Sequence, residues 1–341
     1  MIKPIHEDDE LDIDLVCKLE KIQATWTQFE LKQLIGDRLK ANGMLNKLLI
    51  IPDGRRCWTL QYAESAKFHL DVLPSVVATG YRTILEKAFS NTGAPDTDIL
   101  GIRITDRNTQ NYRTSSNLHD WLKSNPFGYA IWFQDRCKIS TQEVRMMSEA
   151  IQPVPKYQTD KLPLQRVVQI LKRHRDMMFK GDVHKPISII ITTLASKAYN
   201  KETDIITALM NVVTGMASHI EERWSNDHGK RIKWISNPVH EQENFADKWV
   251  EYPERQSNFY LWLTEVKNDL TRIIDQQGKT LQILNESMAK TFGKDVVTKT
   301  FSNYAENQLK KRESGALKMA AGTGMLGSVG TTVKPHNFHG K

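Results

Sequence analysis

The chain has 341 residues, with three cysteines, 40% hydrophobic and 26% charged residues and a formal net charge of +7. This composition is typical of a soluble globular protein of one large or two smaller domains in a reducing compartment, and we expect a cytoplasmic location. We expect no membrane span, secretory signal or disulfide framework, because the sequence lacks a long apolar run and its cysteines are scattered. The positive charge suits anionic ligands such as nucleotides, and a mildly basic surface explains it equally well.

The first part of the chain combines strand-like segments with one clear helix. The residue pattern predicts strands at 13–19, 57–62, 67–76 and 99–106, with Pro74 ending the third. Residues 25–43 have the apolar spacing of a helix that stops at Asn42-Gly43. Strands around a helix predict an α+β domain, which we place at residues 1–150.

Beyond Pro155 the pattern becomes helical. Apolar residues at helical spacing predict helices at 161–180, 186–199 and 204–224, with further helical segments over 242–312. We therefore predict a mainly helical domain over residues 151–312. From Ser314 onward the sequence is rich in glycine, threonine and small residues, which predicts a flexible tail over residues 313–341.

Three aspartates lie on predicted strands. Asp12 and Asp14 are two residues apart, so their carboxylates share one face of a strand, and Asp71 lies on an otherwise apolar strand. Carboxylates on neighbouring strands make an oxygen-rich site that suits two Mg²⁺ or Mn²⁺ ions. Such ions stabilise the entering and leaving oxygens of a phosphoryl or nucleotidyl displacement. The alternative is that these carboxylates lie at strand edges and face water.

Two positions in the helical part are candidate phosphate ligands. Lys172 shares a helix face with Gln165, Gln169 and Asp176, and at the wall of a carboxylate cleft it would neutralise a triphosphate. Ser188 lies near the start of a helix, where a hydroxyl and free N–H groups accept phosphate. Lys172 on a solvated basic face and Ser188 as an ordinary cap are the alternatives. The P-loop pattern is absent, which argues against a P-loop enzyme.

Six segments then occur in a recognisable order: DELDIDLVCKL, FHLDVLPSV, SNPFGYAIWF, LPLQRVVQILKRHRD, KPISIIITTLA and NPVHEQENFADKW. Together they resemble the bacterial cGAS/DncV-like nucleotidyltransferases (CD-NTases) of CBASS anti-phage defence, within the polymerase-β-like superfamily. The resemblance implies an α+β catalytic lobe with a small mixed sheet, a mainly helical oligoadenylate-synthetase-like lobe, and an active site in the cleft between them. It implies synthesis of a cyclic di- or trinucleotide from nucleoside triphosphates such as ATP and GTP, with pyrophosphate released. The product would activate a separate effector.

The resemblance also implies roles for individual residues. Asp12, Asp14 and Asp71 match the metal-binding aspartates, with Asp71 as the base or the ligand on the alkoxide side. Lys172 resembles the lysine that contacts the donor triphosphate, and Ser188 resembles the serine beside it. These implied roles agree with the chemistry that the residues suggest by themselves.

The ends of the chain carry further implications of the resemblance. Asn244 and Asp247 lie in a family motif, and we assign them no role. Gly340, in HNFHGK, resembles the attachment residue of members whose tail a ubiquitin-activating-type ligase conjugates to a target, and here Lys341 follows it. The family's Gly-Ser motif upstream of the Asp-x-Asp strand has no counterpart, so we expect a chain truncated at its N-terminus relative to the family.

Two other functions stay open at this stage. One is a linear nucleotidyltransferase that modifies RNA or protein within the same superfamily. The other is an inactive, truncated scaffold that binds a conjugating partner or nucleic acid through its tail and basic surface. For the leading function we expect no membrane partner and no required nucleic acid, and the sequence does not predict the bases, ring size or linkage of the product.

Overall fold

The computed structural model describes residues 11–62, 68–90, 97–139, 161–276, 279–316, 318–319, 326–327 and 330–332. The chain divides into two compact units, Met1–Lys267 and Asn268–Lys341, and each is described by itself. The domain boundary predicted near residue 150 falls outside the described residues and stays a prediction.

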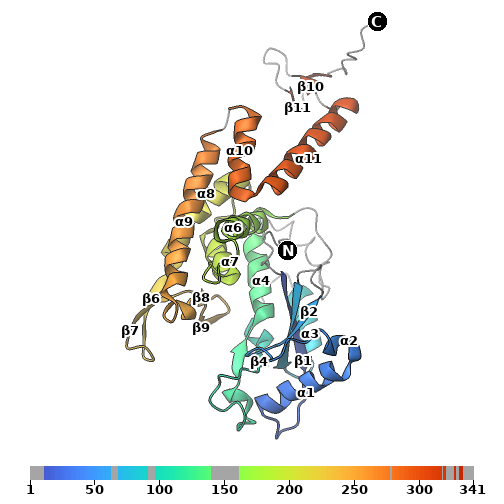
Figure 1. Cartoon of the computed structure of the whole chain (residues 1–341), viewed down its shortest axis with the longest axis vertical. Helices are drawn as coiled ribbons and strands as arrows, with labels where there is room; N and C mark the ends of the chain where they lie inside the picture. Colours follow the sequence, from blue (N-terminus) through green and yellow to red (C-terminus); the bar gives the residue numbers. More distant parts are fainter. Residues whose placement is uncertain are drawn as a thin grey trace. The chain divides into compact units, whose positions relative to one another are not determined.

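The first unit contains a five-stranded mixed sheet (Figure 1). Its strands are β1 (Leu11–Leu19), β2 (Trp58–Tyr62), β3 (Phe68–Val76), β4 (Ile102–Ile104) and β5 (Leu122–Ser124). β3 is central, because β1 pairs with it in parallel along its whole length while β2 and β4 share its other edge in antiparallel pairing. β5 pairs with β4 at the end of the sheet. The predicted strands are therefore confirmed, and the α+β class with them.

Pro74 does not end β3, which corrects the prediction from sequence. β3 continues to Val76, with Pro74 opposite Cys17 of β1. On the other edge, Pro74 lies between the last pair with β2, Trp58 opposite Val72, and the first pair with β4, Ile104 opposite Ser75. A proline is tolerated in this strand because its missing N–H falls where the ladder on that edge changes partner.

Helix α1 (Gln28–Ala41) covers one face of the sheet, and the short helix α2 (Gly43–Asn46) follows it. Thr27 and Glu30 form a capping box that fixes where α1 begins. At Gly36 the helix approaches the sheet so closely that a Cβ atom would lie 2.1 Å from the Trp58 ring. The apolar side chains between helix and sheet include Leu31, Ile35, Leu39, Trp58, Leu60, Val72 and Val76.

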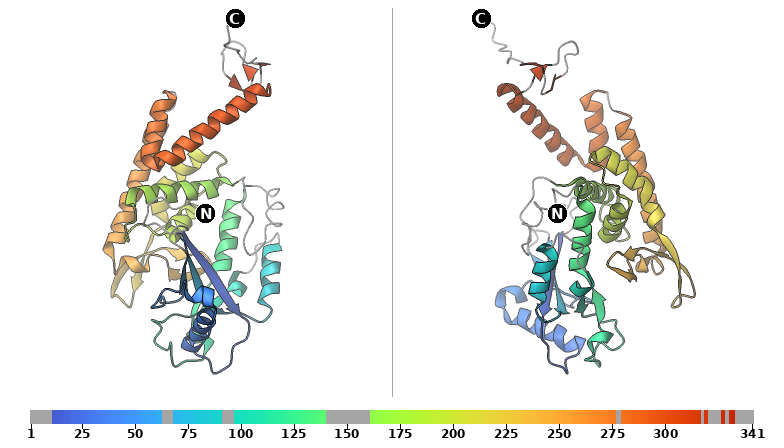
Figure 2. Two further views of the ribbon diagram at one scale, coloured as in Figure 1. Left: turned by 45° about the vertical axis from the view of Figure 1, so that its right-hand side comes forward. Right: turned by 180° about the vertical axis from the view of Figure 1, so that it is seen from behind.

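Helices α3 (Tyr81–Ser90) and α4 (Pro126–Cys137) pack against the opposite face (Figure 2). Tyr81 and Phe127 contact the core on this side, and the Tyr81 hydroxyl donates a hydrogen bond to the Leu100 carbonyl, at 2.6 Å. Val16 of β1 and Leu73 of β3 belong to the same cluster. Side chains alternate along a strand, so Asp14 and Asp71 belong to this face as well.

The helical part of the first unit contains α6 (Pro163–Phe179), α7 (Ser188–Ala198), α8 (Ile205–Gly215) and the beginning of α9 (Pro253–Ile274). The helices predicted at 161–180 and 186–199 are confirmed. The helix predicted at 204–224 is too long, because residues 221–225 form strand β6 (Glu221–Ser225), which pairs with β7 (Lys230–Trp234). The hairpin turn uses Gly229 with φ at 59°, which favours glycine. A further short pair, β8 (Ser236–Asn237) and β9 (His240–Asn244), follows.

Helices α4 and α7 are joined at their C-terminal ends by two basic side chains. Arg136 of α4 donates hydrogen bonds to the carbonyls of Ser196, at 2.8 Å, and Tyr199. In return, the Lys201 ammonium donates to the carbonyls of Asp135 and Arg136, both at 2.8 Å. Each helix end leaves carbonyls without partners inside its own helix, and cations satisfy them here.

The second unit contains α10 (Leu281–Phe292), α11 (Lys294–Glu313) and three two-residue strands. Those strands are β10 (Lys318–Met319), β11 (Leu326–Gly327) and β12 (Thr331–Thr332). The helical segments predicted toward residue 312 are confirmed. Gly340 lies outside the described residues. Among the helices that the structure describes, none combines the length and the apolar character needed to cross a membrane.

Candidate active site

Carboxylates meet a hydroxyl on one face of the sheet. Asp14 of β1 lies directly opposite Asp71 of β3, and Thr59 of β2 lies opposite Asp71 on the other side. The Thr59 hydroxyl donates a hydrogen bond to Oδ1 of Asp71, at 2.5 Å. Residues directly opposite each other in a sheet project to the same face, so β1, β3 and β2 contribute one row of oxygen-bearing side chains.

Asp12 takes the position two residues before Asp14 in β1, opposite His69 of β3. Its backbone belongs to β1, which begins two residues before the strand predicted at 13–19, while its side chain lies outside what the structure describes. The structure therefore brings together Asp14 and Asp71, and leaves the third carboxylate of the predicted triad as a prediction.

The thiol of Cys57, just before β2, responds to the negative charge at this site. Burial raises its pKa most, and the carboxylates of Asp71 and Asp14 raise it further, to about 12. Lys32 and Arg56 act in the opposite direction and do not offset this effect. The thiol therefore stays protonated at physiological pH and is not a nucleophile, and its pKa reports the negative charge of the two carboxylates.

The residues present fit a divalent cation. Asp14, Asp71 and Thr59 supply hard oxygen atoms, the kind of ligand that a divalent cation prefers. Among the side chains that the structure describes, no cluster of three or more His, Cys, Asp or Glu residues is placed to hold a metal ion.

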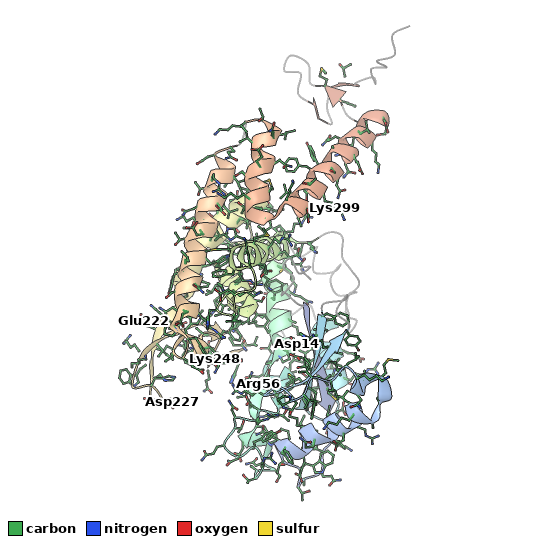
Figure 3. All side chains as sticks on the ribbon, in the orientation of Figure 1. Asp14, Arg56, Glu222, Asp227, Lys248 and Lys299 are labelled. Carbon is green, nitrogen blue, oxygen red and sulfur yellow. The ribbon has the colours of Figure 1, made fainter. Side chains whose placement is uncertain are left out.

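A pocket of about 380 Å³ opens beside Asp71. One wall comes from the sheet and the loop before β2, and the other from the short helix η5 (Asp247–Trp249). Figure 3 labels Asp14 and Arg56 on the sheet side and Lys248 on the helical side. The full lining is Gly54, Arg55, Arg56, Cys57, Thr59, Asp71, Asp247 and Lys248. The pocket thus lies between the two predicted lobes, within the first compact unit.

Asn244 stabilises the backbone turn that directly precedes η5. Its side-chain oxygen accepts hydrogen bonds from the backbone N–H groups of Ile235 and Ala246, both at 2.9 Å, and its side-chain nitrogen donates to the Lys233 carbonyl at 3.0 Å. Asp247, the first residue of η5, lines the pocket. The family motif that contains both residues therefore has one member that builds the turn and one that faces the site.

Lys172 and Ser188 lie close to one guanidinium group, that of Arg175 on α6. Arg175 donates from Nη1 to the Ser188 hydroxyl at 3.0 Å and from Nε to Asp176 at 2.7 Å. Burial, and then the positive charge of Arg175, lower the pKa of Lys172 to about 8. Neither Lys172 nor Ser188 is among the residues that line the pocket at Asp71. Their predicted contact with a donor triphosphate stays a prediction.

Sequence reasoning missed two adjacent arginines at the pocket. Arg55 and Arg56 donate from Nε to the two carboxylate oxygens of Asp106, at 2.6 and 2.8 Å. Burial alone would raise the pKa of Asp106, and the hydrogen bonds from both arginines lower it below its ordinary value. The available signal was the stretch PDGRRCW, a turn with paired cations directly before a strand. Its partner Asp106 is far away in sequence, so spacing could not reveal the pairing.

A buried lysine of α1 binds the loop that carries Arg55 and Arg56. Lys32 of α1 is fully buried, and its ammonium forms an ion pair with Asp53 at 2.8 Å. The same ammonium donates to the carbonyls of Gly54 and, at 3.2 Å, Arg55. A buried ammonium needs this many partners to offset its lost hydration, and the loop is fixed as a result.

Comparison with known proteins adds to this geometry. No family model matches the chain. The c-di-GMP synthase of Roseivirga ehrenbergii is 28% identical over 338 residues, which cover 97% of this chain and 80% of that protein. The chain therefore has a relative over nearly its whole length.

Solved structures show the same fold. The CD-NTase CdnG of Bradyrhizobium diazoefficiens, solved with GTP, superposes with a TM-score of 0.58 at 18% identity, covering 89% of this chain and 81% of that one. The Vibrio cholerae DncV cyclic AMP-GMP synthase, solved with a linear intermediate, gives a TM-score of 0.53 at 16% identity and covers 85% of this chain. The present chain spans 65% of that DncV chain.

The small mixed sheet, the helical part and the pocket between them define a polymerase-β-like nucleotidyltransferase fold. More narrowly, this is the fold of the CD-NTases, and the resemblance to the cGAS/DncV-like nucleotidyltransferases is confirmed.

Proposed function

We propose that the protein is a nucleotidyltransferase that joins nucleoside triphosphates into a cyclic di- or trinucleotide. The observation that carries the proposal is the row of Asp14, Asp71 and Thr59 beside a pocket between two lobes. The relatives add the substrate class, because one is named a c-di-GMP synthase and another was solved with GTP. GTP is therefore the first nucleotide to test, with ATP as the second.

The reaction needs one nucleotide to supply a 3′-hydroxyl and another to supply a triphosphate. The hydroxyl oxygen forms a bond to the α-phosphorus, the bond from that phosphorus to the bridging oxygen breaks, and pyrophosphate leaves. Asp71, held by Thr59, is the residue that accepts the proton or binds the oxygen on this side. Repeating the step between the two ends of the linear product closes the ring.

Asp12, Asp14 and Asp71 are the residues that would hold two divalent ions, Mg²⁺ or Mn²⁺. When bound, the ions would neutralise triphosphate charge and make the 3′-hydroxyl more acidic. Lys172 and Ser188 would bind the donor triphosphate, with Arg175 holding the serine hydroxyl in place. Asp247 and Lys248 would close the pocket from the helical side.

The biological part of the proposal follows from the resemblance. The product would activate a separate effector in CBASS anti-phage defence, in the cytoplasm. Conjugation of the tail through Gly340 by a ubiquitin-activating-type ligase would regulate the enzyme.

The test is product analysis with radiolabelled nucleotides. We expect the full chain with Mg²⁺ or Mn²⁺ to convert GTP, alone or with ATP, into a phosphatase-resistant product whose mass lacks terminal phosphates. A phosphatase-sensitive product, or label transferred to added RNA or protein, would instead support linear transfer. A chain that binds a conjugating partner but neither ATP nor Mg²⁺ would support the scaffold alternative, and either outcome would overturn the proposal.

A further inference from the structure

The two adjacent arginines of the pocket share one buried carboxylate. Arg55 and Arg56 each have 43% of their side chain exposed, while Asp106 is only 2% exposed. Both arginines use Nε for Asp106, one on each carboxylate oxygen. Neither arginine donates a hydrogen bond from its terminal nitrogens to any residue that the structure describes. The terminal nitrogens of both side chains are thus available to a ligand.

Asp106 is itself fixed by two further contacts. Its backbone N–H donates to the side-chain oxygen of Gln28, a fully buried residue of α1, at 2.8 Å. Its Oδ1 accepts from the backbone N–H of Asn108 at 3.0 Å. The hydroxyl of Thr105, the residue before Asp106, donates to the Arg56 carbonyl at 3.1 Å. The carboxylate is therefore a rigid reference point for the arginine side chains.

Two guanidinium groups share the single carboxylate of Asp106, and the carboxylates of Asp71 and Asp247 line the same pocket. Across the pocket, Lys248 is already paired with Glu251 at 2.8 Å. Guanidinium groups present their N–H donors as a fixed fork that matches phosphate oxygens. The available N–H donors of Arg55 and Arg56 therefore favour a phosphate-bearing ligand beside these two arginines, next to Asp71.

We propose that Asp106 is a positioning residue that holds Arg55 and Arg56 so that their terminal nitrogens bind the phosphate groups of the nucleotide that supplies the 3′-hydroxyl. The assignment to this nucleotide comes from the position of the arginines beside Asp71 and Thr59, whereas Lys172 and Ser188 lie outside the pocket lining. The inference rests on the proposed function of the same pocket. Asp106 acts only through the arginines and does not contact the nucleotide.

The direction in which Asp106→Asn changes phosphate affinity distinguishes a positioning role of Asp106 from a purely electrostatic one. Asp106→Asn removes a negative charge from the wall, so Coulomb attraction alone predicts tighter phosphate binding. Positioning predicts weaker binding, because the released guanidinium groups move into water and lose their fixed geometry. The asparagine is nearly isosteric and keeps an oxygen for the Asn108 N–H.

The experiment is a calorimetric titration of the full chain with GTP and, separately, with inorganic tripolyphosphate. Compared with the unmodified chain, we expect Kd to rise about tenfold in Asp106→Asn, the effect of losing one charge-assisted hydrogen bond. The variant carrying Arg55→Gln and Arg56→Gln should bind at least as weakly. Adding Asp106→Asn to that variant should change Kd no further, because Asp106 acts through the arginines.

Tighter or unchanged nucleotide binding in Asp106→Asn would overturn the inference. A further rise in Kd when Asp106→Asn is added to the variant with Arg55→Gln and Arg56→Gln would overturn it as well. If Asp106→Asn does not fold, as thermal unfolding would reveal, the variant with Arg55→Lys and Arg56→Lys decides. The lysine variant keeps both positive charges but loses the planar set of guanidinium N–H donors, so Kd should rise about tenfold. An unchanged Kd would overturn the inference. Because binding requires no turnover, a chain that binds GTP but makes no product refutes the proposed function alone.

Discussion

Asp14 and Asp71 lie directly opposite each other in the parallel ladder between β1 and β3. Neighbouring strands are about 4.8 Å apart, so two carboxylates on one face repel each other unless a cation lies between them. Their effect extends to Cys57, whose pKa they raise above the level set by burial. This pair gives the site negative charge, and the proposed two-metal reaction would place divalent ions there.

Thr59 orients Asp71 through the hydrogen bond to Oδ1. We expect Thr59→Val, which keeps the shape and removes the donor, to lower kcat about tenfold with little change in thermal stability. Steady-state kinetics checks this, with Thr59→Ser as the matched control because serine retains the hydroxyl. Equal kcat values for the valine and serine variants would show that the hydrogen bond has no role.

The Cys57 thiol provides a test of the electrostatics without turnover. With a pKa of about 12, its thiolate fraction should rise about tenfold per pH unit from about pH 8 to pH 10 without a plateau. Alkylation by iodoacetamide, followed for the Cys57 peptide by mass spectrometry, measures this rate. Asp71→Asn removes one of the charges that raise the pKa, so alkylation should be faster at each pH. A plateau below about pH 9 in the unmodified chain would contradict the assignment.

Lys172 predicts how nucleotide affinity depends on pH. Burial and Arg175 lower its pKa to about 8, so the ammonium is charged below this pH and neutral above it. If it binds a donor triphosphate, KM should rise as the pH increases through 8. Lys172→Arg keeps the charge in this range and should remove the rise. An identical pH profile of KM in both proteins would exclude Lys172 as a phosphate ligand.

The reciprocal contacts between α4 and α7 predict a loss of stability. Arg136→Ala leaves the carbonyls of Ser196 and Tyr199 without their donor, so we expect the free energy of unfolding to fall by about 1–3 kcal/mol. Urea denaturation measures the difference. Arg82→Ala is the matched control, because Arg82 forms an exposed pair with Glu86 and should change stability by less than about 0.5 kcal/mol. A similar loss in both variants would show that the contacts do not hold the helices together.

The spacing of apolar residues along the sequence was enough to predict much of the fold. Period-two spacing predicted β1 and β3 and placed Asp71 on the face away from Leu70 and Val72, and the sheet register confirms this arrangement. The helices α6 and α7 followed from apolar residues at helical spacing. These elements are predictable because each buries one continuous apolar face, which leaves a periodic signal in the sequence.

The errors and omissions arise from interactions between distant residues. The segment 221–225 becomes a strand because the turn ending in Gly229 brings β7 alongside, a pairing that the spacing of apolar residues does not reveal. Pro74 is tolerated because two different strands share one edge of β3. Asp106 binds Arg55 and Arg56 across about fifty positions of sequence, a pairing that no local pattern reveals.

The most direct measurement of the central claim is the initial rate of pyrophosphate release from GTP and ATP with Mg²⁺. We expect the unmodified chain to release pyrophosphate, and Asp14→Asn and Asp71→Asn to do so at least about a hundredfold more slowly while remaining folded. Asp37→Asn, which changes an exposed carboxylate of α1, should retain the original rate. Release by Asp71→Asn at the rate of the unmodified chain would contradict the claim that this face of the sheet is the catalytic centre.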